Sequence, residues 1–385
     1  MKLFPLFLCC LLLAGCAASP APVTVEPETT AETVARVPET SVSVAAAADV
    51  VAVDPVRQMI SDMSLEQRVG QLFLARCNAE TAADDIQTYH LGGLVLFGSD
   101  FDNQQPDSMR QVIAAYQAAA ETPLLIAVDE EGGDVTRISR VPAFRDKRFS
   151  SLRKRYDQGG LEAVLTEEEE KCRLLIELGI HVNLGPVCDI TTDSGAFMFS
   201  RSLGQDAQTT AVVTASIVNL MNAFRVGSVL KHFPGYGNNA DTHTGIAVDS
   251  RPLSDFESQD FIPFTAGIQA GAGAVMVGHI IAEALDARLP ASLSPAVHRY
   301  LREELGFTGV IITDDLVMQA ITDQYGTGEA AVMAVLAGND LLCSTEYAVQ
   351  YEAVLQAVLD GRIDIDVLNS AVRHVLEWKI SLGLL

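Results

Sequence analysis

The sequence has few basic residues. Its 26 lysines and arginines face 50 aspartates and glutamates, so the 385-residue chain carries a formal net charge of −24 at pH 7. Phosphates of nucleic acids need lysine and arginine partners, and this balance therefore argues against a nucleic-acid partner. We interpret the acidic excess as a solvated surface that favours solubility.

Cysteines are also few, and they form no CxxC pair. A zinc site needs closely spaced ligands, so we predict no metal, and nothing in the sequence calls for another cofactor. One disulfide is possible in an oxidising compartment, but buried free thiols are the preferred interpretation. The cysteines in the body of the chain are Cys77, Cys172, Cys188 and Cys343.

No apolar run is long enough to span a bilayer comfortably. Lys2 precedes the short apolar stretch 3–13, and small residues then lead directly to Cys16. This order resembles a bacterial lipoprotein signal, in which Cys16 is acylated and becomes the mature N-terminus. An ordinary secretory signal with an incidental cysteine is the alternative. We predict a signal peptide over 1–15 and an extracytoplasmic protein anchored by lipid to a bacterial membrane.

Aromatic side chains are absent from residues 16–54, where Arg36 is the one basic residue. The segment shows no amphipathic period and has too few large apolar side chains to fold. We therefore predict a disordered tether that separates the membrane from the rest of the chain.

The remaining residues, 55–385, repeat short apolar runs that alternate with helix-like segments. Continuous apolar runs are typical of parallel strands buried on both faces. Eight such units predict a single catalytic domain with the (β/α)8 TIM-barrel fold, and a doubly wound open sheet is the alternative. The eight runs cover 72–75, 93–97, 124–128, 181–184, 228–231, 274–277, 309–313 and 340–342.

Further helix signals lie at both ends of this region. Ser64 and Gln67 have the spacing of a capping box. Two helical stretches are expected near the C-terminus, over 346–359 and 366–382, and no second domain is expected after them.

Reactive side chains follow the apolar runs. The carboxyl ends of the strands of a barrel surround its active site, and charged groups that converge there cost desolvation energy that a structural role rarely repays. The sequence therefore predicts a catalytic site at this end. The groups concerned are Asp129, Asp189, Lys231, His232, His279, Asp314 and Asp315.

Two catalytic roles follow from the positions of three residues. Asp314 ends a very apolar run, so its carboxylate is expected to be held rigidly and to attack an electrophilic carbon. Asp241 and His243 lie in a glycine-containing loop, where a carboxylate beside an imidazole forms a proton-transfer pair. Together they fit double displacement at an anomeric carbon. The alternatives are a helix cap for Asp314 and a surface hydrogen bond for the other two.

Three groups of motifs lie within 54–385. The first is Lys231-His232-Phe233-Pro234-Gly235-Tyr236-Gly237 with Asp241-Thr242-His243. The second is Asp129-x-Glu131-Gly132-Gly133-x-Val135-x-Arg137. The third combines 290–294, 301–307 and 312–318. In their order and spacing these motifs resemble glycoside hydrolase family 3, in its single-domain β-N-acetylhexosaminidase (β-N-acetylglucosaminidase) form.

The resemblance implies that Asp314 is the nucleophile and His243 the acid/base, with Asp241 as its partner. It implies retaining hydrolysis of terminal non-reducing β-linked N-acetylglucosamine, from peptidoglycan- or chitin-derived glycans, through a covalent glycosyl-aspartate intermediate. It further implies sugar binding by Asp129, Arg137, Arg201, Lys231 and His232.

Smaller expectations concern the surroundings of the site. Asp189 and His279 are expected to support it by hydrogen bonding, and Asp315 to begin the next loop. Asp134 stands where the family commonly has arginine, and Tyr236 replaces a frequent histidine. Both departures bear on leaving-group preference. A monomer is the default.

Two other functions remain open. One is a phosphorylase on the same scaffold, because a histidine repels incoming phosphate less than a glutamate would. The other is a lipoprotein that only binds glycans on an inactive barrel.

Overall fold

The computed structural model describes residues 54–239 and 245–385. The predicted signal peptide, Cys16 and the predicted tether up to residue 53 lie outside the described residues, and so do Asp241 and His243. Within the described ranges no helix is long and apolar enough to cross a bilayer.

Eight parallel strands form the centre of the fold. They are β1 (Phe73–Arg76), β2 (Gly93–Leu96), β3 (Leu125–Val128), β4 (Val182–Asn183), β5 (Gly227–Phe233), β7 (Ala274–Val277), β9 (Val310–Thr313) and β10 (Leu342–Ser344). All of their residues are buried apart from the half-buried Arg76, which explains the continuous apolar runs.

The strands close into a barrel. They neighbour one another in the order β10-β1-β2-β3-β4-β5-β7-β9, and a parallel bridge between Ile312 and Leu341 joins the two outer strands. The predicted (β/α)8 fold is confirmed, and the open-sheet alternative is wrong. A separate two-stranded sheet pairs β6 (Val248–Asp249) with β8 (Ile281–Ala282).

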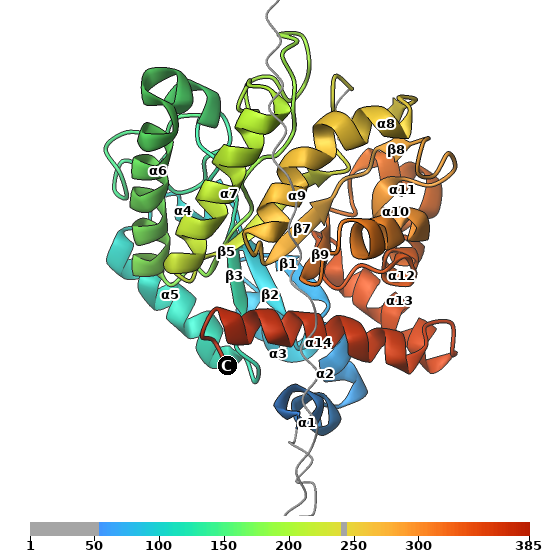
Figure 1. Ribbon diagram of the computed structural model, residues 1–385. Helices are drawn as coiled ribbons and strands as arrows, with labels where there is room; N and C mark the ends of the chain where they lie inside the picture. The colour runs from blue at the N-terminus through green and yellow to red at the C-terminus, as the bar shows by residue number, and fades with distance from the viewer. Residues whose placement is uncertain (1–53, 240–244) are drawn as a thin grey trace, which may run out of the picture. The chain divides into compact units, whose positions relative to one another are not determined.

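Helices connect the strands and cover the outside of the barrel (Figure 1). They are α1 (Pro55–Asp62), α2 (Leu65–Gly70), α3 (Ala82–Tyr89), α4 (Gly98–Phe101), α5 (Pro106–Ala119), α6 (Leu152–Leu178), α7 (Ala207–Ala223), α8 (Leu253–Asp255), α9 (Phe261–Gln269), α10 (Pro295–Arg299), α11 (Gln319–Tyr325), α12 (Thr327–Ala337), α13 (Tyr347–Leu359) and α14 (Ile365–Ser381). The last two agree with the prediction to within one residue at each end. The predicted capping box is present, because Ser64 and Gln67 bond reciprocally at the start of α2.

Trp378 closes the amino end of the barrel. Apolar side chains from the strands fill the interior, and Trp378 of α14 belongs to the same cluster. A Cβ atom on Gly273, just before β7, would lie 2.2 Å from its ring, and one on Gly227, at the start of β5, would lie 2.8 Å away. These two glycines let the indole pack against the strand starts, so the opposite end is left for chemistry.

The chain enters the barrel domain beside α14. Asp54 caps α1, and its carboxylate pairs with Arg373 of α14 at 2.8 Å. Residue 54 therefore lies on the side of the domain that Trp378 closes. The four cysteines of the body, Cys77, Cys172, Cys188 and Cys343, are buried free thiols, which confirms the preferred interpretation.

Candidate active site

A cavity of about 960 Å³ opens at the carboxyl ends of the strands. Ligand pockets in proteins commonly measure roughly 300–1,000 Å³, so the cavity can hold a small glycan. Every residue that was predicted to act as nucleophile or to bind sugar, and that lies in the described part of the chain, lines this cavity. These residues are Asp129, Arg137, Arg201, Lys231, His232 and Asp314.

Asp314 is the first residue after β9. Its backbone N–H donates to the carbonyl of Val277 at 3.0 Å, which fixes it to the end of β7. Its Oδ1 accepts a hydrogen bond from the backbone N–H of Asp315 at 2.9 Å. The carboxylate is therefore carried on rigid backbone at the cavity wall, which suits a nucleophile.

Asp315 and His279 hold the loop that follows Asp314. The Asp315 carboxylate accepts hydrogen bonds from the backbone of Val317 at 3.2 Å and from the hydroxyl of Thr345 at 2.6 Å. His279 is buried, and its Nε2 lies 3.0 Å from the carbonyl oxygen of Asp315. Its Nδ1 lies 2.7 Å from the Ser292 hydroxyl. These contacts agree with the expected supporting role of His279, and they place Asp315 at the start of the loop, as expected.

Five charged side chains form a continuous network on another wall of the cavity. Lys231 Nζ lies 2.6 Å from Asp129 Oδ1 and 2.6 Å from Glu131 Oε1. Arg137 approaches the other oxygen of Asp129 at 3.6 Å. Arg201 forms a two-pronged pair with Glu131, at 2.6 and 2.9 Å. Such alternating charges fix donors and acceptors that can bind sugar hydroxyls.

Comparison with known proteins gives the family. The model of the glycosyl hydrolase family 3 N-terminal domain matches residues 64–378. A β-hexosaminidase of Stenotrophomonas maltophilia (strain R551-3) is 35% identical over 315 residues, which is 76% of this chain and 91% of that relative. The chain belongs to glycosyl hydrolase family 3. It groups there with the β-hexosaminidases, and it is a glycosidase.

Solved structures agree with this grouping. A family 3 β-N-acetylglucosaminidase from Paenibacillus sp. FPU-7 superposes with a TM-score of 0.79 at 32% identity, over 84% of this chain and 63% of that one. A β-N-acetylhexosaminidase from Beutenbergia cavernae gives a TM-score of 0.75 at 29% identity, over 82% of this chain and 98% of that one. The barrel thus accounts for almost the whole of the second protein but for less than two thirds of the first.

Glu131 is the centre of the charge network in this family 3 chain, although no role was predicted for it. Burial alone would raise its pKa, but the charges of Lys231 and Arg201 outweigh burial and lower the pKa below its usual range. Burial alone would lower the pKa values of Lys231 and Arg201. The negative charges of Asp129 and Glu131 outweigh burial and raise the pKa of Lys231. The charge of Glu131 outweighs burial and raises the pKa of Arg201. All three side chains therefore remain charged.

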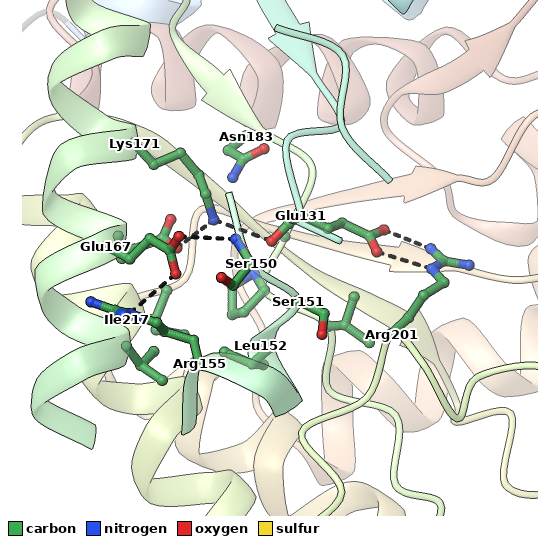
Figure 2. Close-up of a pocket in the computed structure, with 16 residues that line it drawn as sticks. Glu131, Ser150, Ser151, Leu152, Arg155, Glu167, Lys171, Asn183, Arg201 and Ile217 are labelled. Atoms are coloured by element: carbon green, nitrogen blue, oxygen red, sulfur yellow. Dashed lines mark hydrogen bonds and ion pairs between the residues drawn. The ribbon is translucent and has the colours of Figure 1, made fainter. Parts of the chain in front are cut away.

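The main chain of Glu131 is held from the other side. Figure 2 shows its side chain reaching Arg201 while Lys171 of α6 points toward its carbonyl. Lys171 Nζ donates to that carbonyl at 3.4 Å and pairs with Glu168 at 2.7 Å. A small cavity of about 40 Å³ is lined by residues of α6, by Glu131 and by Arg201, and Arg201 also lines the larger cavity. Its volume suits ordered water rather than a glycan.

Asp189 orients His232. Its carboxylate lies 2.7 Å from Nδ1 of the imidazole and accepts the backbone N–H of His232 at 3.1 Å and of Tyr236 at 2.8 Å. The other ring nitrogen, Nε2, lies 3.3 Å from Arg201. Because Nδ1 faces a carboxylate, we assign the tautomer protonated at Nδ1. The expectation that Asp189 supports the site agrees with this geometry.

The two departures from the family pattern both line the cavity. Asp134 is exposed at its rim. Tyr236 is buried, and its ring lies 5.4 Å from that of His232 and 5.7 Å from that of Phe197. The tyrosine therefore belongs to the packed wall, whereas the aspartate adds negative charge at the entrance.

Among the described residues, no group of three or more histidine, cysteine, aspartate or glutamate side chains is arranged to hold a metal ion.

Proposed function

We propose that the protein hydrolyses terminal non-reducing β-linked N-acetylglucosamine residues from peptidoglycan- or chitin-derived glycans, with retention of configuration. One observation carries the proposal: Asp314 lines the same glycan-sized cavity as the network of Asp129, Arg137, Lys231 and Arg201. The grouping with β-hexosaminidases supports the choice of an acetamido sugar.

The chemistry takes two steps. In the first, an Asp314 oxygen attacks the anomeric carbon, the glycosidic bond breaks, and His243 protonates the departing oxygen. In the second, His243 removes a proton from water, and the water oxygen displaces Asp314 from the anomeric carbon. Asp241 orients His243 and stabilises its protonated form. Two inversions give overall retention.

Sugar binding is assigned to the charge network and His232. Asp129 is held by two cations but keeps lone pairs that can accept hydroxyl protons, and Arg137 has further N–H donors. These groups fix the ring so that its anomeric carbon faces Asp314. Holding reactants in such an arrangement can supply roughly 7–11 kcal/mol of a barrier.

The enzyme is anchored outside the cytoplasm by lipid on Cys16. The order of Lys2, the apolar stretch 3–13 and Cys16 supports this arrangement. Cys16→Ser is expected to move the protein from the membrane fraction to the soluble fraction of cells. Retention of Cys16→Ser in the membrane fraction would contradict lipid anchoring at this residue.

The activity is tested with the full chain and two chromogenic substrates, an aryl β-N-acetylglucosaminide and an aryl β-glucoside. We expect preferential cleavage of the acetamido sugar, loss of cleavage in Asp314→Ala, and a reduction of about 10²- to 10⁴-fold in His243→Ala. The anomer released first, followed by NMR, should be the β form. A fluorinated substrate that slows the second step should leave a sugar on the peptide containing Asp314.

Three outcomes would contradict the proposal. Release of the α anomer would exclude retention. Sugar-1-phosphate as the main product in phosphate buffer would replace hydrolysis by phosphorolysis. Absence of turnover by folded wild type would favour a binding protein.

A further inference from the structure

The two ends of segment 240–244 are joined to each other by described side chains. On the amino side, residues 235–239 follow β5, and on the carboxyl side Asp249 ends β6. β6 pairs with β8, and the backbone N–H of Ile281 donates to the carbonyl of Ala247 at 2.9 Å. The carboxyl side is therefore part of a small sheet.

Asn239 links the two sides directly. Its amide Nδ2 donates to Asp249 Oδ2 at 2.8 Å and to the carbonyl of Tyr236 at 2.9 Å. The neighbouring Asn238 accepts a hydrogen bond from the hydroxyl of Thr191 at 2.8 Å. The amino side is thus held to Asp249 and to the loop after β4.

Arg251 completes the link. Its Nε donates to both oxygens of Asp249, at 3.0 and 2.9 Å, and its Nη1 donates to Asp260 Oδ2 at 2.7 Å. The guanidinium also lies 4.4 Å from the centre of the Phe256 ring. Both carboxylates are 2% exposed, so the arginine compensates two buried negative charges at once.

Two glycines place residues 235–239 against this ion pair. Gly235 has φ +112° and Gly237 has φ +52°. A Cβ atom on Gly237 would lie 2.8 Å from Arg251 Nη2, and one on Gly235 would lie 2.4 Å from Asp260 Oδ1. The backbone thus packs directly on the guanidinium and its partner, and larger side chains would push it away.

We propose that Arg251, through Asp249 and Asp260, is a positioning residue for proton transfer in the catalytic reaction. It fixes the two backbone attachment points between which Asp241 and His243 lie in the sequence. This inference rests on the proposed function, because it requires His243 to be the acid/base. Arg251 is absent from the residues that line the large cavity, so it acts through the chain and not on the sugar.

The short connection makes the attachment points matter. Asp241 is the second residue after Asn239, and His243 is the sixth before Asp249. Because so few residues separate the two catalytic groups from these points, we expect a displacement of either point to displace the imidazole. A misplacement of about 1 Å can reduce a rate by roughly 10²-fold.

The test separates acid catalysis from general damage by varying the leaving group. A dinitrophenyl group departs without protonation, whereas an alkyl or methoxyphenyl group needs the acid. Because kcat/KM reports steps up to the first bond cleavage, loss of acid positioning lowers kcat/KM for the poor leaving group alone. The substrates are the two corresponding β-N-acetylglucosaminides.

The variants are Arg251→Met, Arg251→Lys, Asn239→Ala and the matched control Arg302→Met, all in the full chain. Arg302 also pairs with a buried aspartate, Asp340, at 2.6 Å, and its guanidinium lies 5.4 Å from the Phe307 ring. It does not line the large cavity. Arg302→Met therefore reports the effect of losing a comparable ion pair elsewhere.

We expect Arg251→Met to lower kcat/KM for the poor leaving group by about 10- to 100-fold and for dinitrophenolate by less than about threefold. Asn239→Ala should also lower kcat/KM selectively for the poor leaving group, by a smaller factor. This variant tests the proposal if Arg251→Met does not fold. Arg251→Lys, which keeps the charge, should recover part of the loss. Arg302→Met should show no leaving-group dependence.

Equal losses for both substrates, or no loss, would overturn the positioning role. His243→Ala in the same assay distinguishes failure of the acid/base assignment from failure of the positioning role of Arg251. If His243→Ala is selective for the poor leaving group and the Arg251 variants are not, the inference about Arg251 alone fails. If His243→Ala is not selective, the acid/base assignment fails and the inference fails with it.

Discussion

Lys379, in the last turn of α14, is completely buried. Its ammonium donates to Gln71 Oε1 at 2.6 Å, and that is its one hydrogen bond within the described residues. Burial lowers its pKa from 10.5 to about 7. Lys379→Met would replace this cation by an unbranched apolar side chain of similar length, and we expect the variant to be more stable than wild type near neutral pH.

The size of the gain follows from linkage. The ordinary pKa is 10.5 and the folded pKa about 7, a gap of about 3.5, which at about 1.36 kcal/mol per pKa unit gives roughly 5 kcal/mol. Because the unfolded chain holds the proton more tightly, this cost is fully present below about pH 7. It disappears as pH rises from about 7 toward 10.5. Between about pH 6.5 and pH 9, wild type should therefore gain about 2.5 kcal/mol relative to Lys379→Met.

Urea unfolding followed by circular dichroism at these two pH values measures the difference. Loss of the hydrogen bond to Gln71 costs about 1 kcal/mol, but equally at both pH values, so it cancels in the comparison. The exposed Lys147 provides the control Lys147→Met, which should show no such pH dependence. A stability difference between wild type and Lys379→Met that is the same at both pH values would show that the buried ammonium is solvated and would refute the reasoning.

Three further perturbations have expected outcomes. Trp378→Ala should lower the free energy of unfolding by about 3–5 kcal/mol, measured by circular dichroism, because it empties the closed end of the barrel. Glu131→Gln should lower kcat/KM on an aryl β-N-acetylglucosaminide by about 10²-fold, since Lys231 and Arg201 lose their shared counter-charge. Because the folded pKa of Glu131 is depressed, its stabilisation is fully present above the ordinary pKa of 4.5 and is lost as pH falls through the folded value. The urea midpoint of Glu131→Gln should therefore fall less steeply in acid than that of wild type. Asp189→Asn should raise KM for the same substrate by about tenfold while changing kcat less, because His232 loses the carboxylate that orients it.

The barrel was predictable from the sequence because its strands are buried on both faces. The run Leu125–Val128, for example, is entirely buried, so its residues are all apolar and the run stands out. β4 spans only Val182 and Asn183, yet the apolar run around it still marked the strand. Closure was predicted from the number of units, eight, and from no local pattern, so an open sheet stayed an alternative until the bridge between Ile312 and Leu341 joined the outer strands.

The site was predictable where chemistry follows a strand end. Asp314 and Lys231 could be assigned because each terminates an apolar run that the barrel must orient toward its mouth. The role of Glu131 was missed because its partner Arg201 lies 70 residues away in sequence, and burial, not sequence, holds the two together. The burial of Lys379 could not be predicted from the sequence either, because a lysine on an amphipathic helix is ordinarily solvent-exposed.

In the proposed mechanism the catalytic groups depend on two kinds of support. The backbone of Asp314 is fixed at the strand ends by its hydrogen bond to the carbonyl of Val277, which any residue could make, so the position of this backbone depends on the fold. Segment 240–244 instead connects attachment points that depend on particular side chains, above all Arg251 and Asn239. Substitutions of those two residues should therefore impair proton transfer while leaving attack by the nucleophile intact, a separation that substitutions in the barrel core would not produce.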